Sequence, residues 1–329
     1  MTEKALKRIL LVDDEPNILN AVQRELQSPP HSRYRYEIEA FSVPEQALAR
    51  AREQAFDLVI SDYRMPGMDG LALLKALGTL QPDCARIALS GQTDFAALMR
   101  MVNETHVYRF IPKPWHDYYL KGSVVQALNY AGTLAEHRRL AGQVREHGIE
   151  PPAADDDAIE QILVVDDDPG VLASLSRVLT HHTRMDDLYS VIRAEVAHQR
   201  GALLREGRLS VQVTPSPRHA LEMAGKIDFA CVLADYRMPE MNGIDLLQRF
   251  ADLRPECERI LISGQVGADE LVNAIDSAHV FAYIAKPWED YELKSCIALA
   301  LAHRRMLHDN RVLAAMVEKS GHFAAGDGT

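Results

Sequence analysis

The chain contains the same set of charged and polar residues twice, each time at the ends of short apolar runs. The first set is an acidic pair, a lone aspartate, a serine and a lysine: Asp13, Asp14, Asp62, Ser90 and Lys113. The second set has the same residue types in the same order: Asp166, Asp167, Asp235, Ser263 and Lys286. Carboxylates supply the hard oxygen ligands that Mg²⁺ or Mn²⁺ takes, and a hydroxyl and an ammonium can bind phosphoryl oxygens. The pattern therefore predicts metal-assisted phosphoryl chemistry on an aspartate.

The two sets are in step along the chain. Asp62 and Asp235 are 173 positions apart, as are the two serines and the two lysines, whereas Asp13 and Asp166 are 153 apart. The difference between 173 and 153 means that the second copy has 20 extra residues, at about 180–208. A period this long indicates two whole domains, because solenoid repeats run roughly 20–50 residues. The apolar spacing of the extra segment predicts an added helix, either a surface elaboration or a partner-docking surface.

The elements that must position these residues alternate between apolar runs and amphipathic helices. In the first copy we expect strands at 9–12, 36–40, 58–60, 86–89 and 107–111, and helices from Pro16 and over 44–52, 71–77 and 94–104. Short, continuous apolar runs are typical of strands in a parallel sheet. The alternation predicts a doubly wound (βα)5 fold of the α/β class. Such sheets bind ligands outside the carboxyl ends of their strands, where all the polar residues of the set fall.

Both copies end in a helix that is longer than a compact domain needs. The first is expected from Asp117 to about His147 and the second from Asp290 to about Lys319. Pro151-Pro152, followed by an acidic run, indicates a linker. We therefore expect a first domain over 1–125, an extended helix and linker over 126–158, a second domain over 159–303 that holds the insertion, and a C-terminal helix with a disordered, Gly-rich tail over 304–329.

Composition limits the class of protein. Of the 329 residues, 47% are apolar and 25% are charged, which is ordinary for a soluble globular protein. The formal charge of −11 argues against nonspecific binding to nucleic acid or to an anionic membrane. The four cysteines form no Cys-x-x-Cys, so neither a disulfide framework nor a zinc site is indicated. With no signal region at the start and no apolar run near the ~20 residues of a membrane span, we expect a cytoplasmic protein.

In both copies these motifs resemble the receiver domain of two-component response regulators. The resemblance rests on the acidic pair, the central aspartate in Asp-Tyr-Arg-Met-Pro, the serine after the fourth strand and the Lys-Pro after the fifth, and it covers about 8–125 and 160–300. It implies two flavodoxin-like receiver domains whose central aspartates, Asp62 and Asp235, accept a phosphoryl group from a phosphohistidine. It also implies these metal ligands: Asp13, Asp14, Asp62 and the carbonyl of Arg64, and in the second copy Asp166, Asp167, Asp235 and the carbonyl of Arg237.

The resemblance gives roles to further residues. The lysines and serines would stabilise the phosphoryl group: Lys113, Lys286, Ser90 and Ser263. Phe110 and Tyr283 would be the aromatic residues that follow the serine hydroxyl inward on phosphorylation, a local charge event that biases a two-state element. The peptide bonds Lys113–Pro114 and Lys286–Pro287 would be cis.

Four residues sit two positions after an aspartate or a serine of the set: Arg64, Gln92, Arg237 and Gln265. We expect these side chains to overhang the phosphoryl group, to control the access of water and so to set the lifetime of the phosphoaspartate. The alternative is that they only solvate the rim of the site.

The leading functional hypothesis is a tandem receiver in a phosphorelay, phosphorylated by a histidine kinase or a histidine phosphotransfer protein. Beyond residue 303 we expect no DNA-binding or catalytic output domain, so output would pass to a separate effector protein. Enzymatic activity would be limited to self-phosphotransfer and autodephosphorylation. Alternatives are a phosphate sink, a phosphorylation-independent adaptor, and a metal-dependent aspartyl phosphatase of the haloacid dehalogenase type. The spacing opposes the phosphatase, whose nucleophile lies in an Asp-x-Asp at the end of strand one.

Several residues outside the set leave two interpretations open. Trp115 and Trp288 follow each Lys-Pro and would serve either a partner surface or packing at a helix start. His137 and His303 lie on the long helices, and we interpret them as solvated rather than as phosphotransfer histidines. The heptads of the long helices are imperfect, so homodimerisation through them, or through the face near strand five, stays open.

Overall fold

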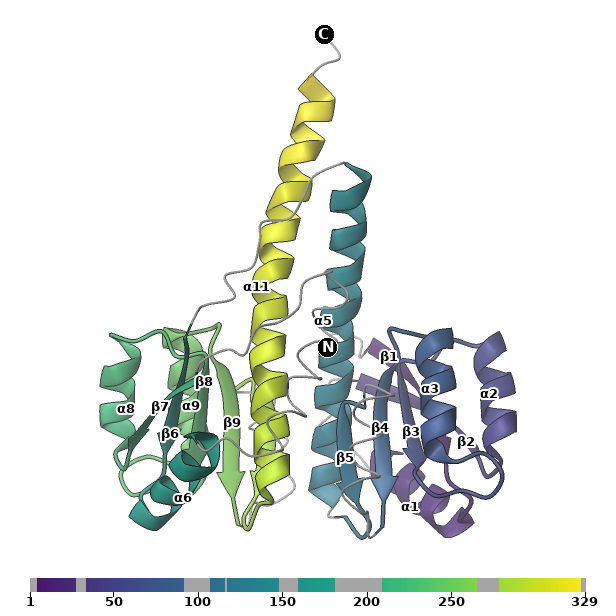
Figure 1. Cartoon of the computed structure of the whole chain (residues 1–329), viewed down its shortest axis with the longest axis horizontal. Coiled ribbons are helices and arrows are strands. Elements are labelled where there is room, and N and C mark those ends of the chain that lie inside the picture. Colours follow the sequence, from purple (N-terminus) through teal and green to yellow (C-terminus); the bar gives the residue numbers. More distant parts are fainter. Residues whose placement is uncertain are drawn as a thin grey trace. The chain divides into compact units, whose positions relative to one another are not determined.

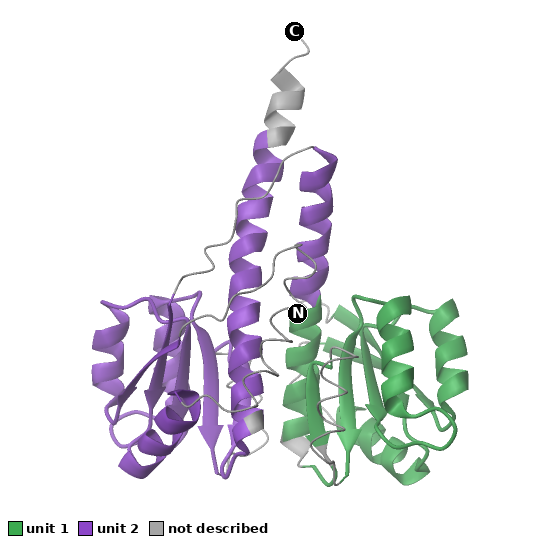
Figure 2. Ribbon diagram, in the orientation of Figure 1, with its two compact units in different colours: residues 1–131, 265–277 green, residues 132–264, 278–329 purple. Residues whose placement is uncertain are grey.

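The computed structural model describes residues 5–27, 34–91, 107–115, 117–147, 159–180, 209–264 and 278–326. The chain divides into two compact units (Figure 2): one comprises residues 1–131 and 265–277, the other residues 132–264 and 278–329. The predicted helix at 94–104, the residues Gln92 and Gln265, and the insertion from 181 to 208 lie outside the described residues.

The first unit is built on a five-stranded parallel sheet with strand order β2-β1-β3-β4-β5 (Figure 1). The strands are β1 (Ala5–Val12), β2 (Tyr34–Phe41), β3 (Leu58–Asp62), β4 (Ala85–Ser90) and β5 (Arg109–Pro112). The helices are α1 (Pro16–Gln27), α2 (Pro44–Glu53), α3 (Gly70–Leu80) and α5 (Asp117–Glu146). This strand order is that of flavodoxin-like sheets, which confirms the predicted fold class.

Alternate residues of β1 explain why helices cover both faces of this sheet. Ile9 and Leu11 belong to a core with the apolar residues of α1 and α5, whereas Leu10 and Val12 belong to a core with those of α2 and α3. All four side chains are fully buried. Successive side chains of a strand point to opposite faces, so an unbroken apolar run requires a helical layer on each side.

The second unit repeats this plan in order β10-β9-β8-β6-β7. Its strands are β6 (Glu160–Val165), β7 (Leu209–Thr214), β8 (Cys231–Asp235), β9 (Glu258–Ser263) and β10 (Ala282–Ala285). Its helices are α6 (Pro169–Thr180), α8 (Pro217–Ala224), α9 (Gly243–Leu253) and α11 (Asp290–Gly326). Read from β7, the order corresponds strand for strand to that of the first unit.

The two long helices extend well past the sheets that precede them. α5 has 30 residues, begins in the first unit and belongs to the second unit from Gly132 onward. α11 has 37 residues and continues to Gly326, so the prediction that the helix ends near Lys319 was wrong. The residues after Lys319 contain no proline, and the helix continues through Gly321, since a single glycine is tolerated within a helix. In the described part of the chain, neither of these helices nor any other is long and apolar enough to span a membrane.

Candidate functional site

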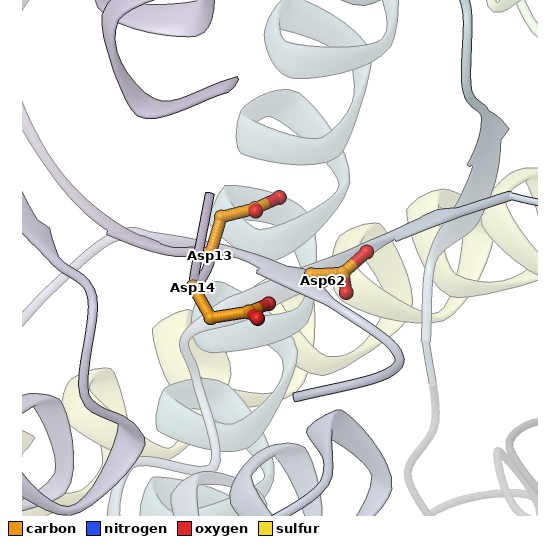
Figure 3. Close-up of side chains that lie close together, drawn as sticks. All are labelled: Asp13, Asp14 and Asp62. Carbon is orange, nitrogen blue, oxygen red and sulfur yellow. The ribbon is translucent and has the colours of Figure 1, made fainter. Parts of the chain in front are cut away.

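Three carboxylates meet at the carboxyl end of the first sheet. Asp13 and Asp14 directly follow β1, and Asp62 is the last residue of β3. β1 and β3 pair in parallel, with Leu11 beside Ile60, so their carboxyl ends lie at the same edge. Ligand oxygens of the three aspartates lie within 4.8 Å of one another, and Figure 3 shows Asp13 and Asp14 pointing toward the side of Asp62.

Lys113 places one positive charge among these carboxylates. Its Nζ lies 2.7 Å from Oδ2 of Asp13 and 2.7 Å from Oδ1 of Asp62. Its backbone N–H donates to the carbonyl of Ser90 (2.6 Å), which ties the end of β5 to the end of β4. Three carboxylates and one ammonium carry a net charge of −2 when all are ionised, and hard oxygen donors suit a divalent cation. The residues present therefore fit a metal such as Mg²⁺.

Backbone amides hold the aspartate side chains in place. Oδ2 of Asp62 accepts a hydrogen bond from the N–H of Arg64 (3.0 Å), and Oδ1 of Asp13 accepts one from the N–H of Glu15 (3.0 Å). Asp13 and Asp62 are both buried, whereas Asp14 is half-buried and Arg64 is exposed at the rim. Each buried carboxylate thus has one amide and one ammonium partner, which orients it before any ligand arrives.

The second unit reproduces this arrangement. Nζ of Lys286 lies 2.6 Å from Asp166 and 2.5 Å from Asp235, and its N–H donates to the carbonyl of Ser263 (2.8 Å). Oδ2 of Asp235 accepts from the N–H of Arg237 (2.9 Å), as Asp62 does from Arg64. Asp167 is exposed. Among the described residues, only the first unit brings three acidic ligand atoms as close as 4.8 Å.

Burial shifts the pKa values of charged groups in both sites. It raises the pKa of Asp13 above the ordinary value, although the hydrogen bond from Lys113 opposes this. Asp166 follows the same pattern with Lys286. Burial lowers the pKa of Lys113, but its hydrogen bonds to Asp13 and Asp62 outweigh this effect and leave that pKa raised. The lysine therefore stays charged at neutral pH, so the site keeps a fixed cation beside its acidic groups.

The two predicted switch aromatics lie in different surroundings. Tyr283 is 2% exposed, and its hydroxyl donates to the carbonyl of Ser263 (2.9 Å). Phe110 is half-buried and packs against the core formed with α2 and α3. The tyrosine is thus attached to the strand end that carries Ser263, whereas a phenylalanine has no hydroxyl with which to make that bond.

Two glycines contribute to the sites but were not predicted from the sequence. Gly70 begins α3 and Gly243 begins α9, and they are 173 positions apart. A Cβ on Gly70 would lie 2.0 Å from the carbonyl oxygen of Asp62, and one on Gly243 would lie 2.2 Å from that of Asp235. Each helix start therefore packs directly on the backbone of the central aspartate. The repeat offset was the signal that could have found them.

The structure resolves some of the open interpretations. Both Lys–Pro bonds are cis, at Lys113 and Lys286, as the resemblance implied. Trp115 donates to Glu25 of α1 (2.9 Å), and Trp288 packs against the core of the second unit, so both tryptophans have packing roles.

The interpretation of His137 and His303 as solvated residues was wrong. Both are partly buried, and both make hydrogen bonds to side chains far away in the sequence. Such partners could not be recognised from the residues around each histidine.

The sequence matches the family described as the response regulator receiver domain over residues 9–124 and 193–298, more than half of the chain. The second match begins after β6. However, β6 pairs with both β7 and β8, so the second sheet includes a strand that the match leaves out. The insertion separates that strand from the rest of its domain.

Similar proteins include transcriptional regulators. The hydrogenase transcriptional regulatory protein HoxA of Cupriavidus necator is 31% identical over 137 residues, 42% of this chain and 27% of that protein. The C4-dicarboxylate transport transcriptional regulatory protein DctD of Rhizobium meliloti is 31% identical over 136 residues, 41% of this chain and 28% of that protein. The chain therefore spans less than a third of the length of these relatives.

Among solved structures, the signal receiver domain of an HD domain-containing protein from Pseudomonas fluorescens Pf-5 is 35% identical. That match covers 39% of this chain and 98% of the other, with a TM-score of 0.35. The family match, together with two sheets of the same strand order, shows that this chain belongs to the response regulator receiver domain family and carries two receiver domains.

Proposed function

We propose that both receivers accept a phosphoryl group, on Asp62 and Asp235, from the phosphohistidine of a histidine kinase or a histidine phosphotransfer protein. The observation that carries the proposal is the duplicated geometry of the central aspartate. In each unit this carboxylate lies at a strand end, held by the N–H two residues further on and by a lysine that also contacts the first aspartate of the acidic pair. The same two contacts at the same relative positions make a phosphoacceptor role the simplest common function.

The residues that would hold Mg²⁺, or Mn²⁺, are the acidic pair, the central aspartate and the carbonyl of Arg64 or Arg237. The ion would supply positive charge against the repulsion between a carboxylate and an incoming phosphoryl group. The protein's own contribution is to orient the nucleophile. An oxygen of Asp62 forms the new O–P bond while the P–N bond breaks, and the imidazole nitrogen leaves with the electron pair.

Lys113 and Ser90 would then stabilise the phosphoryl oxygens. The ammonium is a compact point charge on a flexible stem, so it can exchange its contacts with Asp13 and Asp62 for one with the phosphoryl group. Lys286 and Ser263 would do the same in the second receiver. Arg64 and Arg237 are exposed at the rims of the two sites, a position from which their side chains could limit the access of water and so set the lifetime of the phosphoaspartate. For Gln92 and Gln265, which lie outside the described residues, that role stays a prediction from the sequence.

Signal output would pass through protein contacts to a separate effector. The two relatives described above are named as transcriptional regulators, but the described part of this chain consists of two receivers and their long helices. We place the receiver domains at 1–125 and 159–303, in a cytoplasmic two-component system. Catalysis would be limited to self-phosphotransfer and autodephosphorylation.

The test is intact-mass spectrometry of the full chain after incubation with a divalent metal and phosphoramidate. Wild type should gain two phosphoryl groups, and Asp62→Ala and Asp235→Ala should each lose one. Asp252→Asn, an exposed aspartate on α9, is the matched control and should leave both additions intact. Two additions that persist in the Asp62→Ala/Asp235→Ala double variant would refute the assignment, and turnover of a phosphate monoester would support the phosphatase instead.

A further inference from the structure

The end of α5 packs against α11 within the second unit. Leu140 and Val144 form a small apolar core with Leu313 of α11, and Met316 and Val317 pack against it. Figure 2 shows the end of α5 beside α11 in the second unit, and the contacts advance together along both sequences, so the two segments run in the same direction. α11 thus has a partner segment, residues 132–146, from its own chain.

The contacting residues follow a coiled-coil spacing. In α5 they are Thr133, His137, Leu140 and Val144, and in α11 the positions 173 residues further on hold Met306, Asn310, Leu313 and Val317. Steps of four, three and four residues keep one face of a helix toward its partner. The pairing is in register with the internal repeat at two layers: the equivalent residues His137 and Asn310 hydrogen bond to each other, and the equivalent residues Leu140 and Leu313 share one apolar core.

One layer of this interface is polar. Asn310 is 9% exposed, and its Oδ1 lies 2.8 Å from Nδ1 of His137. Its Nδ2 donates to the carbonyl of Thr133 (3.1 Å). Because Oδ1 can only accept, His137 must carry its proton on Nδ1. A single buried polar residue at such a position specifies the register and the partner of a coiled coil at some cost in stability.

A second polar contact lies seven residues before Asn310 along α11, or about two turns. Nε2 of His303 lies 3.1 Å from Oγ1 of Thr133, and Nδ1 lies 2.8 Å from Oε1 of Glu258, the first residue of β9. A proton on Nδ1 lets the ring donate to the carboxylate and accept from the hydroxyl. Thr133 thus contacts two α11 residues, Asn310 through its backbone carbonyl and His303 through its hydroxyl.

The base of α11 is also fixed to its own sheet by ion pairs. Arg305 lies 2.6 Å from Glu160 of β6, and Arg304 lies 2.9 Å from Asp228. The equivalent positions of α5 hold Ala131 and Gly132, which carry no charge. The two helices therefore have equivalent apolar residues at Leu140/Leu313 and Val144/Val317 but different polar partners, so their interface joins two unlike surfaces.

We propose that residues 132–146 are the dedicated partner of α11, and that the layer formed by His137, Asn310 and Thr133 selects this pairing over one between two copies of the chain. If two α11 helices paired in register, Met306 would take the place of Thr133 and a second Asn310 that of His137, so that His303 would lose its hydroxyl partner and Asn310 its imidazole partner. Buried polar groups without partners are costly. Joining both helices in one chain also raises their effective concentration. The proposal does not depend on phosphorylation of either receiver.

Cysteine cross-linking of the full chain tests both the partner and the register. Leu140→Cys/Leu313→Cys places thiols in the same layer, and Val144→Cys/Leu313→Cys places them one layer apart. Arg139→Cys/Ala315→Cys, at exposed positions of the same helices, is the matched control. The four native cysteines are buried and will not compete. After mild oxidation with diamide, mass and mobility on non-reducing gels distinguish bonds within a chain from bonds between chains.

The expected result is a disulfide within the monomer for the same-layer pair, formed roughly ten-fold faster than for the other two pairs. Adding Asn310→Leu should reduce this ratio several-fold, because the wrong register then leaves fewer buried polar groups unpaired. His137→Leu is a second variant with the same expectation, in case the first fails to fold. Cross-linked dimers in the same-layer pair, or a ratio that neither substitution changes, would overturn the proposal.

Discussion

A methyl group added at Gly70 should damage the first receiver at its phosphoacceptor. The Cβ of Gly70→Ala would lie 2.0 Å from the carbonyl oxygen of Asp62, whereas real Cβ atoms do not approach closer than 3.0 Å. The start of α3 and the end of β3 must therefore separate by about 1 Å, the difference between these distances. Overpacking of this kind costs roughly 1–3 kcal/mol.

The separation also weakens the hydrogen bond from the N–H of Gly70 to the carbonyl of Tyr63 (2.9 Å), which is worth about 1 kcal/mol. The total is roughly 2–4 kcal/mol, which corresponds to an increase of roughly 30- to 700-fold in hydrogen exchange of the β3 amides. A 1 Å misplacement of a reacting group can cost about 100-fold in rate. We therefore expect phosphorylation of Asp62 to slow by about that factor.

The assay combines peptide-resolved hydrogen exchange with the rate of phosphorylation by phosphoramidate in an Asp235→Ala background, where only Asp62 reports. Gly142→Ala in α5 is the control, because nothing lies within 4 Å of its added Cβ. It should leave both readouts at the values of the parent chain. If Gly70→Ala exchanged and reacted at the control's rates, the close approach of α3 to β3 would not constrain Asp62.

Three further predictions concern the charged sites and the thiols. Lys113→Met leaves two buried carboxylates without their ammonium partner, so it should lower the free energy of unfolding by roughly 3 kcal/mol. The melting temperature should fall, and added Mg²⁺ should partly restore it. An unchanged melting temperature would contradict this prediction. Mg²⁺ should raise the melting temperature of wild type, since a ligand that binds only the native state stabilises it. Asp14→Asn should reduce that rise. The control Asp69→Asn, which lies outside the cluster of carboxylates, should leave it unchanged. Burial raises the pKa of the Cys84 and Cys257 thiols to about 12, so both stay protonated at pH 8. They should react with a thiol reagent only after the protein is unfolded in urea. Rapid labelling of the native protein would instead show that these thiols are accessible.

Much of the fold followed from the sequence because its signals are local. Continuous apolar runs such as Ile9–Val12 indicated buried parallel strands, and the polar residue after each run indicated the edge where the site forms. The 173-residue offset then doubled the evidence for Asp62 and Lys113. These residues came together because parallel strands end at a common edge.

The remaining features depend on contacts between distant segments. The roles of Gly70 and Gly243 come from a backbone carbonyl that local sequence does not reveal. The long helices appeared to have imperfect heptads because two of their inward positions hold the polar residues His137 and Asn310. Each residue interrupts the apolar pattern of its own helix, and only the structure shows that the two hydrogen bond to each other. Helix α11 passed its predicted end because a glycine such as Gly321 favours a helix end but does not enforce one, and no proline follows it.

The in-register pairing of α5 with α11 limits where this chain can change length. Each residue inserted into a helix rotates everything beyond it by about 100° and moves it by about 1.5 Å. A single insertion between His137 and Leu140 would thus put the polar and apolar layers of α5 out of step, and a matching insertion between Asn310 and Leu313 would be needed to recover both. The 20 additional residues of the second copy instead lie between α6 and β7, outside both of the paired helices. The two copies could diverge in length there without disturbing the pairing of their final helices.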